Sequence, residues 1–157
     1  MKVRQAELRD LPEVKEMFVK LIDYVKDCGQ WALSDNPADI GNGIMGFLLS
    51  KMSHEENVLL VAVGDDDVPT GFLAGWIMNY PMFYQHQKVA ELQFLYPLSF
   101  SEGAPLRTAF DEWGKGLGAT ATSNYCTPGN EASRKVMERD GRRLSYTHYF
   151  KPYEVQP

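Results

Sequence analysis

The sequence predicts a single mixed α/β domain of the α+β type, spanning residues 1–157. Two kinds of apolar pattern point to it. Residues 8–29 repeat apolar side chains every three or four positions, as an amphipathic helix does, whereas residues 57–63 form an unbroken apolar run that is typical of a buried strand. With 44% apolar and 24% charged residues, the composition is that of an ordinary globular protein, and the length suffices for one core.

Ten elements are expected along the chain. The first helix begins near Asp10, which can cap it, with Pro12 in its first turn, and ends at Gly29. Together the elements predict a central sheet with helices on both faces. Strands are expected at residues 2–7, 57–63, 72–80, 88–96, 119–126 and 142–153, and helices at 8–29, 38–52, 107–118 and 127–141.

Charge and composition exclude several classes of function. A net charge of −5 argues against a general nucleic-acid binder, because phosphate binding favours a positive field. Cys28 and Cys126 have no CxxC spacing and only three histidines are present, so no metal site is expected. The polar start is no secretory signal, and no apolar run reaches the roughly 20 residues of a membrane span. A reduced, cytoplasmic protein without membrane contact is expected.

The order of elements and several local phrases resemble the GNAT superfamily of acyl-CoA-dependent N-acyltransferases. The matching phrases are residues 3–18 (opening strand and helix), 57–77 (central hairpin), 90–96 (fourth strand), 110–119 (end of the third helix) and Asn130 to Gly141 (fourth helix). The resemblance implies a mostly antiparallel mixed sheet in which strands four and five splay apart. It also implies acetyl-CoA as co-substrate, a primary amine on a small molecule or a protein as acceptor, and pairing of two copies as a homodimer.

The resemblance also implies where the cofactor binds. Backbone groups of the fourth strand would hold the pantetheine arm, and amides at the start of the third helix would hold the pyrophosphate, because free N–H groups and the helix dipole favour anions there. Asn130 would contact the pantetheine, although it equally fits a helix N-cap. Arg134, on a basic fourth helix, would meet the ribose phosphate or lie on a solvated face. The backbone positions are Phe94, Leu95, Tyr96, Ser101, Glu102 and Gly103.

The catalytic residues are implied in the same way. Glu91 occupies the strand-four position where relatives often carry a catalytic base, although a solvent-facing strand residue fits the alternation too. In relatives, one position of the fourth helix often carries a Tyr that acts as the general acid. Here that position holds Met137, which cannot donate a proton. Tyr125 or Cys126, at the end of strand five, could replace it, or could serve packing alone.

The phosphate loop departs from the family's pattern of Arg or Gln, two residues, Gly, one residue, then Gly or Ala. Counting from Tyr96 places Glu102, Pro105 and Arg107 in these slots, and counting back from Trp113 places Leu98, Ser101 and Gly103 there. The two counts differ by about one helical turn. Ser99 and Glu102 form a capping box, which favours the second count and a helix that begins near Phe100.

Glu102 puts a negative charge where an anion would bind, unless it is a solvated capping carboxylate. Tyr80, Phe83 and Tyr84 gather in one connection and are candidates for an acceptor pocket, a partner surface or simple anchoring.

The resemblance makes an N-acetyltransferase the first functional hypothesis. The alternatives are a GNAT-fold protein without catalysis that acts as a binding or regulatory module, and an assembly protein.

Overall fold

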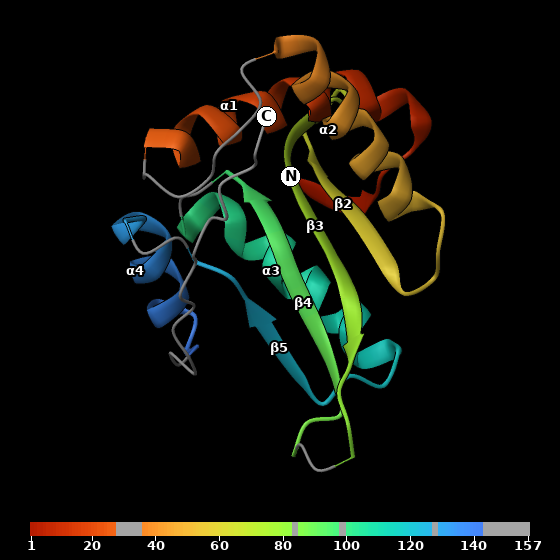
Figure 1. Cartoon of the computed structure of the whole chain (residues 1–157), viewed down its shortest axis with the longest axis vertical. Helices are drawn as coiled ribbons and strands as arrows, with labels where there is room; N and C mark the ends of the chain where they lie inside the picture. The colour runs from red at the N-terminus through yellow and green to blue at the C-terminus, as the bar shows by residue number, and fades with distance from the viewer. Residues whose placement is uncertain (28–35, 83–84, 98–99, 127–128, 143–157) are drawn as a thin grey trace, which may run out of the picture.

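The computed structural model describes residues 1–27, 36–82, 85–97, 100–126 and 129–142. Within these ranges five strands form one sheet in the order β1-β2-β3-β4-β5 (Figure 1). The first four strands pair antiparallel, and β5 pairs parallel with β4. The strands are β1 (Lys2–Gln5), β2 (Asn57–Val63), β3 (Pro69–Asn79), β4 (Lys88–Tyr96) and β5 (Ala121–Asn124). The predicted mixed, mostly antiparallel sheet is confirmed.

Four α-helices cover the two faces of the sheet in the described part of the chain. They are α1 (Leu11–Asp27), α2 (Pro37–Met52), α3 (Phe100–Gly116) and α4 (Glu131–Arg139), and a short 3-10 turn, η1 (Leu8–Asp10), precedes α1. Side chains of α1 and α2 share one core cluster, and those of α3 and α4 share the other. The expected order of elements is confirmed as far as α4, and the strand expected at 142–153 falls almost wholly outside the described residues.

The start of the first helix differs from the prediction. Asp10 does not cap α1 but lies in η1, where its carboxylate accepts from the backbone N–H of Glu7 at 2.7 Å. The same carboxylate accepts two bonds from the guanidinium of Arg4 in β1, at 2.7 and 3.0 Å. The buried Asp10 therefore links the first strand to the first helix, because a guanidinium offers a stronger partner than a helix amide. α2, in contrast, begins with a side-chain N-cap: the side-chain oxygen of Asn36 accepts a hydrogen bond from the backbone N–H of Ala38 at 3.1 Å.

The two faces of the sheet have different cores. On the α1 and α2 face, Phe18 packs against Phe72 and Phe94 with ring centroids 5.4 and 4.7 Å apart. On the α3 and α4 face, Leu106 and Phe110 are fully buried beneath the sheet. Because Ala90 and Leu92 belong to this second core, the alternation of β4 turns Glu91 toward the α1 and α2 face.

The sheet opens between β4 and β5. Register pairs join the two strands only from Val89–Ala121 to Leu92–Asn124. Beyond them β4 continues to Tyr96 while β5 ends, and Figure 1 shows the two strands diverging away from their paired ends. We call this opening the fork. Residues 93–96 of β4 line it, and the last paired residues, Glu91–Ser123 and Leu92–Asn124, form its base. A bulge at Gln93, between the β3 partners Ala74 and Gly75, marks where the separation begins.

Candidate functional site

Among the described residues, the fork leaves one edge of β4 without a strand neighbour. From Phe94 to Tyr96, β4 is paired with β3 on one side, and its other side faces the gap beyond β5. An edge of this kind presents backbone N–H and C=O groups that an extended ligand can pair with. The three residues predicted to hold a pantetheine arm, Phe94, Leu95 and Tyr96, thus lie together on this edge. Their contact with a cofactor remains a prediction.

Buried polar atoms without a hydrogen-bond partner gather at the fork. Among the described residues these atoms include Glu91 Oε2, Gln93 Oε1 and Ser123 Oγ. Glu91 and Ser123 are register partners across β4 and β5, so their side chains share one face of the sheet. Buried polar groups are normally satisfied, since an unmade hydrogen bond costs about 1–3 kcal/mol. Three such atoms together indicate a site that is completed by a polar ligand or by water.

Glu91 is held by one firm contact. Its side chain is buried, and Oε1 accepts a 2.8 Å hydrogen bond from the indole N–H of Trp76 on β3. On the same face, the ammonium of Lys51, from the last turn of α2, lies 4.2 Å from the centre of the Trp76 ring. Burial lowers the pKa of Lys51 to about 8, and the negative charge of Glu91 acts against that shift. Glu91 Oε2 has no hydrogen-bond partner, and a role of Glu91 as the base remains a prediction.

The first turn of α3 contains all three residues expected to bind the pyrophosphate. The helix begins at Phe100, as the count back from Trp113 predicts, so Ser101, Glu102 and Gly103 lie in its N-terminal turn. Ser101 and Glu102 are exposed, and Gly103 is buried against Arg107. The proposed capping residue Ser99 lies outside the described residues. Free amides at this turn can bind an anion, and Glu102 is equally well placed to favour the helix dipole.

Gly103 makes room for a buried guanidinium. A Cβ at this position would stand 2.8 Å from Nη1 of Arg107, which follows one turn later. Arg107 donates from Nη2 to the carbonyl of Phe100 at 3.1 Å, and its Nε lies 3.4 Å from a carboxylate oxygen of Asp140. Since helical side chains lean toward the helix start, Arg107 places its charge beside the first turn of α3. A glycine here therefore leaves room for the Arg107 guanidinium, which a larger residue would have to displace.

Asn130 is the N-cap of α4. Its Oδ1 accepts from Ser133 N–H at 2.9 Å and from the hydroxyl of Tyr24 in α1 at 3.3 Å. The capping interpretation is thus confirmed, and a pantetheine contact through the remaining amide group stays a prediction. Arg134 is exposed and pairs with Glu131 at 2.7 Å and Glu138 at 3.7 Å on its own helix. These pairs favour a solvated face, and a ribose phosphate contact stays a prediction as well.

The end of β5 supplies the alternative proton donors. Tyr125 follows β5 and is 47% exposed. Cys126 is exposed, and its thiol lies 3.6 Å from the carbonyl of Asn130. Met137 is buried in the core beneath α4, so its place in the sequence pattern reflects packing. An acid role for Tyr125 remains a prediction.

The aromatic connection is described only in part. The backbone N–H of Tyr80 donates to the carbonyl of Gln87 at 2.6 Å and closes the connection. Phe83 and Tyr84 lie outside the described residues. The proposed role of all three as an acceptor surface is therefore a prediction.

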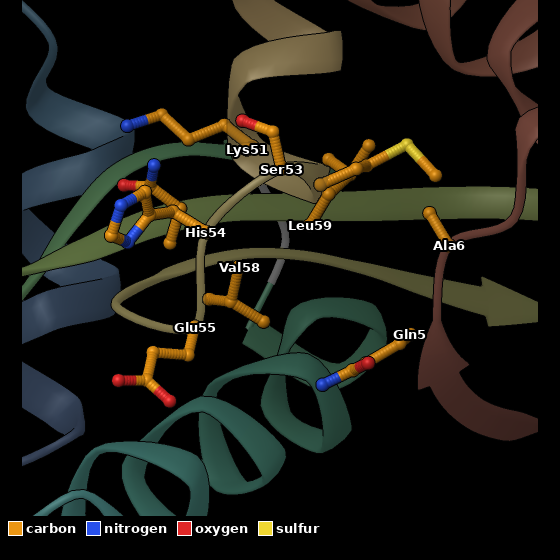
Figure 2. A pocket seen from close by; sticks show the side chains of 10 residues that line it. Gln5, Ala6, Lys51, Ser53, His54, Glu55, Val58 and Leu59 are labelled. Atoms are coloured by element: carbon orange, nitrogen blue, oxygen red, sulfur yellow. The ribbon is translucent and has the colours of Figure 1, made fainter.

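A separate pocket of about 300 Å³ lies where β1 ends beside the turn after α2. Figure 2 shows its lining, which includes Gln5, Ala6, His54 and Glu55. The stem of Lys51 borders this pocket, but its amino group points away from Gln5 and Ala6. Lys51 thus borders this pocket with its stem and contacts Trp76 with its ammonium.

Four residues of this site were not predicted from the sequence. Trp76 and Lys51 stand in apolar runs and read as core residues, and Gln93 and Ser123 carry no motif. Only the register of β3, β4 and β5 brings Trp76, Gln93 and Ser123 to Glu91. The isolated Lys at the end of the apolar run 44–52 was the one available signal, since lysine is rarely buried without a partner.

In the described ranges, no group of three or more His, Cys, Asp or Glu side chains could hold a metal ion. A search of the same ranges also finds no helix with the length and apolar character needed to cross a membrane.

Comparison with known proteins gives structural matches only. No protein-family model matches the chain, and no curated protein sequence does. Aminoglycoside N-acetyltransferase AAC(6')-Iy in complex with CoA is 18% identical, with a TM-score of 0.75 over 98% of this chain and 95% of the other. The AAC(6')-Ig enzyme from Acinetobacter haemolyticus is 15% identical, with a TM-score of 0.75 over 99% of this chain and all of the other.

A further structure shows AAC(6')-Iy with the bisubstrate analogue CoA-S-monomethyl-acetylneamine. It is 18% identical to this chain, with a TM-score of 0.73 over 98% of both chains. At such identities the likeness establishes the fold alone. The chain therefore has the fold of the GNAT acetyltransferases.

Proposed function

We propose that this protein transfers the acetyl group of acetyl-CoA to a primary amine. The observation that carries the proposal is the fork, where Glu91 Oε2, Gln93 Oε1 and Ser123 Oγ are buried without partners beside an open strand edge. An extended amide-containing arm would satisfy the edge of β4 from Phe94 to Tyr96. AAC(6')-Iy, which has the same fold, was solved in complex with CoA and with a bisubstrate analogue that contains CoA, and this supports CoA as the ligand class.

The chemistry follows from the position of Glu91. A primary amine is protonated at neutral pH and must lose a proton before it can attack a thioester. Oε2 of Glu91 would accept that proton directly or through a water. The amine nitrogen then bonds to the carbonyl carbon and loses its second proton to water. The carbon–sulfur bond breaks, and CoA leaves as a thiolate that takes up a proton from Tyr125 or water.

The pyrophosphate would bind at the first turn of α3. The amides of Ser101, Glu102 and Gly103 lie there, and the helix dipole favours an anion. Arg107 adds a buried positive charge beside that turn. Asn130 and Arg134 on α4 would contact the pantetheine and the ribose phosphate, and Tyr80, Phe83 and Tyr84 would border the acceptor. The acceptor itself would be a small molecule or a protein, and the enzyme would act in the cytoplasm.

A binding module without catalysis is the second candidate. Two observations favour it: Met137 is buried in the core where an acid would be needed, and Glu102 places a carboxylate at the α3 start. Such a protein would bind CoA, or another ligand at the fork, and would acetylate nothing.

A thermal-shift titration with acetyl-CoA and free CoA tests the common part of both candidates. A ligand at 100 times its dissociation constant stabilises the native state by about 2.7 kcal/mol, so binding raises the melting temperature clearly. Absence of any shift at millimolar ligand would exclude the enzyme. Mass spectrometry of neamine, spermidine and a lysine peptide after incubation with acetyl-CoA then separates enzyme from binding module.

The variant Glu91→Gln assigns the base. It should bind acetyl-CoA with unchanged affinity and lose turnover by at least about a hundredfold, as removal of a general base does. The exposed Glu112→Gln on α3 is the matched control and should keep both properties. Retained turnover in Glu91→Gln would remove Glu91 from the chemistry.

A further inference from the structure

Two opposite charges are buried on either side of one indole ring. Lys51 is 3% exposed and Glu91 is 1% exposed. The Lys51 ammonium lies 4.2 Å from the centre of the Trp76 ring and 5.0 Å from that of Phe47. The indole N–H of the same Trp76 donates to Glu91 Oε1 at 2.8 Å. Lys51 and Glu91 feel each other's charge but form no direct ion pair.

Burial of two charged groups without a direct ion pair is expected to lower the stability of the folded protein, so the arrangement calls for a functional explanation. The Lys51 side chain is buried, and its ammonium contacts aromatic faces, which replace lost hydration only in part, since cation–π contacts contribute about 2 kcal/mol when desolvated. The pKa of Lys51 is lowered to about 8 chiefly by burial, and Glu91 opposes the shift. Among the described residues, the titratable side chains of His54 and Glu55 line the pocket beside the stem of Lys51 (Figure 2). At pH 7 the cation still predominates.

We propose that Lys51 and Trp76 are positioning residues for Glu91, with Trp76 fixing Oε1 by its N–H and Lys51 balancing the carboxylate charge from across the indole. The proposal rests on the proposed function for its chemical purpose, but its structural part can be tested without turnover.

The geometry gives each residue a separate task. A cation over the face of an indole withdraws electron density, so the N–H becomes a better donor to the carboxylate. The hydrogen bond occupies Oε1 and fixes the rotation of the carboxyl group. Oε2 has no hydrogen-bond partner and is then the oxygen that can take the acceptor's proton. The positive charge of Lys51 offsets the negative charge of the Glu91 carboxylate.

The first experiment uses the free protein and the indole N–H signal of Trp76 in a proton–nitrogen NMR spectrum. Trp76→Phe assigns the signal among the three tryptophans. In the native protein the signal should shift with a midpoint near pH 8, where Lys51 loses its charge. In Lys51→Met this transition should vanish, and in Lys51→Arg it should move beyond the range, because arginine stays charged.

Glu91→Gln provides the reciprocal arm. Without the carboxylate, the Lys51 pKa should fall below that of the native protein, because the charge that opposes the burial shift is gone. The proposal would be overturned if the Trp76 signal does not change with pH in the native protein, or if it changes equally in Lys51→Met. Both NMR measurements can be made whether or not the protein binds CoA. A failure of this proposal can therefore be distinguished from a failure of the proposed function.

Kinetics adds the functional arm once an acceptor is known from the panel of probe amines. Trp76→Phe keeps the ring but removes the N–H, and loss of a hydrogen bond to a charged group should lower kcat about tenfold with the KM for acetyl-CoA unchanged. Lys51→Met should lower kcat as well, and Lys51→Arg should recover part of the loss. A merely structural role would change stability in these variants without separating kcat from KM, and that result would refute the positioning role.

Discussion

The hydroxyl of Tyr24 donates a 3.3 Å hydrogen bond to Oδ1 of Asn130, and this bond joins α1 on one face of the sheet to α4 on the other. The same oxygen caps α4 through Ser133 N–H. Both bonds use Oδ1, so the amide nitrogen of Asn130 is the group left to meet a ligand at the fork. One side chain thus combines a capping role, a link between two layers and a candidate cofactor contact.

Substitution of Asn130 should separate these roles. Asn130→Ala removes the cap and should lower the free energy of unfolding by about 1 kcal/mol, whereas Asn130→Asp keeps an acceptor oxygen and should stay near the native value. If the amide nitrogen binds pantetheine, both variants lose affinity for CoA. Urea denaturation and calorimetric titration with CoA measure the two effects. Tyr24→Phe is the control for the interhelix bond, and equal CoA affinity in all three variants would leave Asn130 as a cap alone.

The sequence predicts strands better than it predicts the site. The strands at 57–63 and 88–96 have the predicted boundaries, because each is rich in apolar residues and is flanked by turn residues. The start of α3 is harder, since Gly103 and Pro105 discourage a helix there, and only the capping pattern and the count from Trp113 indicated Phe100. Burial of Gly103 against Arg107 compensates for this poor local propensity, and tertiary packing of that kind is invisible in the sequence.

The candidate site, like the start of α3, depends on tertiary contacts that the sequence does not reveal. Resemblance to a known family indicates Glu91, but the partners of Glu91 come from a different strand and a different helix. Trp76 reaches it through the β3–β4 register, and Lys51 through the packing of α2 on the sheet. Neither contact has a local signature, because each depends on how distant elements are superposed. Asp10 illustrates the reverse case, in which a local capping rule is overridden by a charged partner, Arg4.

Gly75 is the glycine whose replacement should do most damage. A Cβ at this position in β3 would lie 2.7 Å from the carbonyl oxygen of Glu91 and would collide with the ring of Phe110. Since the carbonyl belongs to β4 itself, the contact cannot be relieved by a side-chain rotation. Gly75→Ala should lower the free energy of unfolding by about 3 kcal/mol, as severe overpacking does, and should also displace Glu91.

Gly43 in α2 is the matched control for this change. A Cβ there meets open space, so Gly43→Ala should stabilise the protein by up to about 1 kcal/mol through better helix propensity. Urea denaturation of both variants provides the comparison. A Gly75→Ala protein as stable as the native one would show that β3 and β4 can separate without cost.

The link between Arg4 and Asp10 should control stability in acid. The hydrogen bond from Arg4 holds the pKa of Asp10 below its ordinary value of 3.8. Because the pKa is lower in the folded state, the stabilisation is fully present above pH 3.8 and is lost as the pH falls through the folded pKa. Asp10→Asn should lower the free energy of unfolding by about 2 kcal/mol at pH 7, since it weakens a charge-assisted pair at a buried site.

The difference between Asp10→Asn and the native protein should shrink as the pH falls below 3.8. Asp67→Asn is the control: Asp67 also contacts Arg4, at 3.1 Å, but its side chain is 44% exposed. Its backbone has a positive φ of 60°, which asparagine tolerates, so the substitution tests charge alone. It should cost clearly less than Asp10→Asn, because exposed ion pairs contribute little. A pH-independent difference for Asp10→Asn would mean that the loss arises from packing.

Glu102 decides how well the start of α3 can bind an anion. It is an exposed carboxylate in the first helical turn, where it favours the helix dipole but opposes a phosphate. At roughly 5 Å an unrelieved repulsion would be on the order of 3 kcal/mol, and exposure to water and salt should reduce it greatly. Glu102→Gln should therefore raise CoA affinity by about threefold at low salt, while it lowers the free energy of unfolding by about 0.5 kcal/mol.

The two effects of Glu102→Gln should respond differently to salt and position. The gain in CoA affinity should disappear above roughly 0.5 M salt, where the Debye length falls below about 5 Å. Glu112→Gln removes the same charge from the same helix ten residues later and should change neither quantity, because a helix rises about 15 Å over that interval. Calorimetric titration with CoA at two salt concentrations gives the comparison. A fall in affinity for Glu102→Gln would mean that Glu102 turns away from the ligand and supports the turn whose amides bind it.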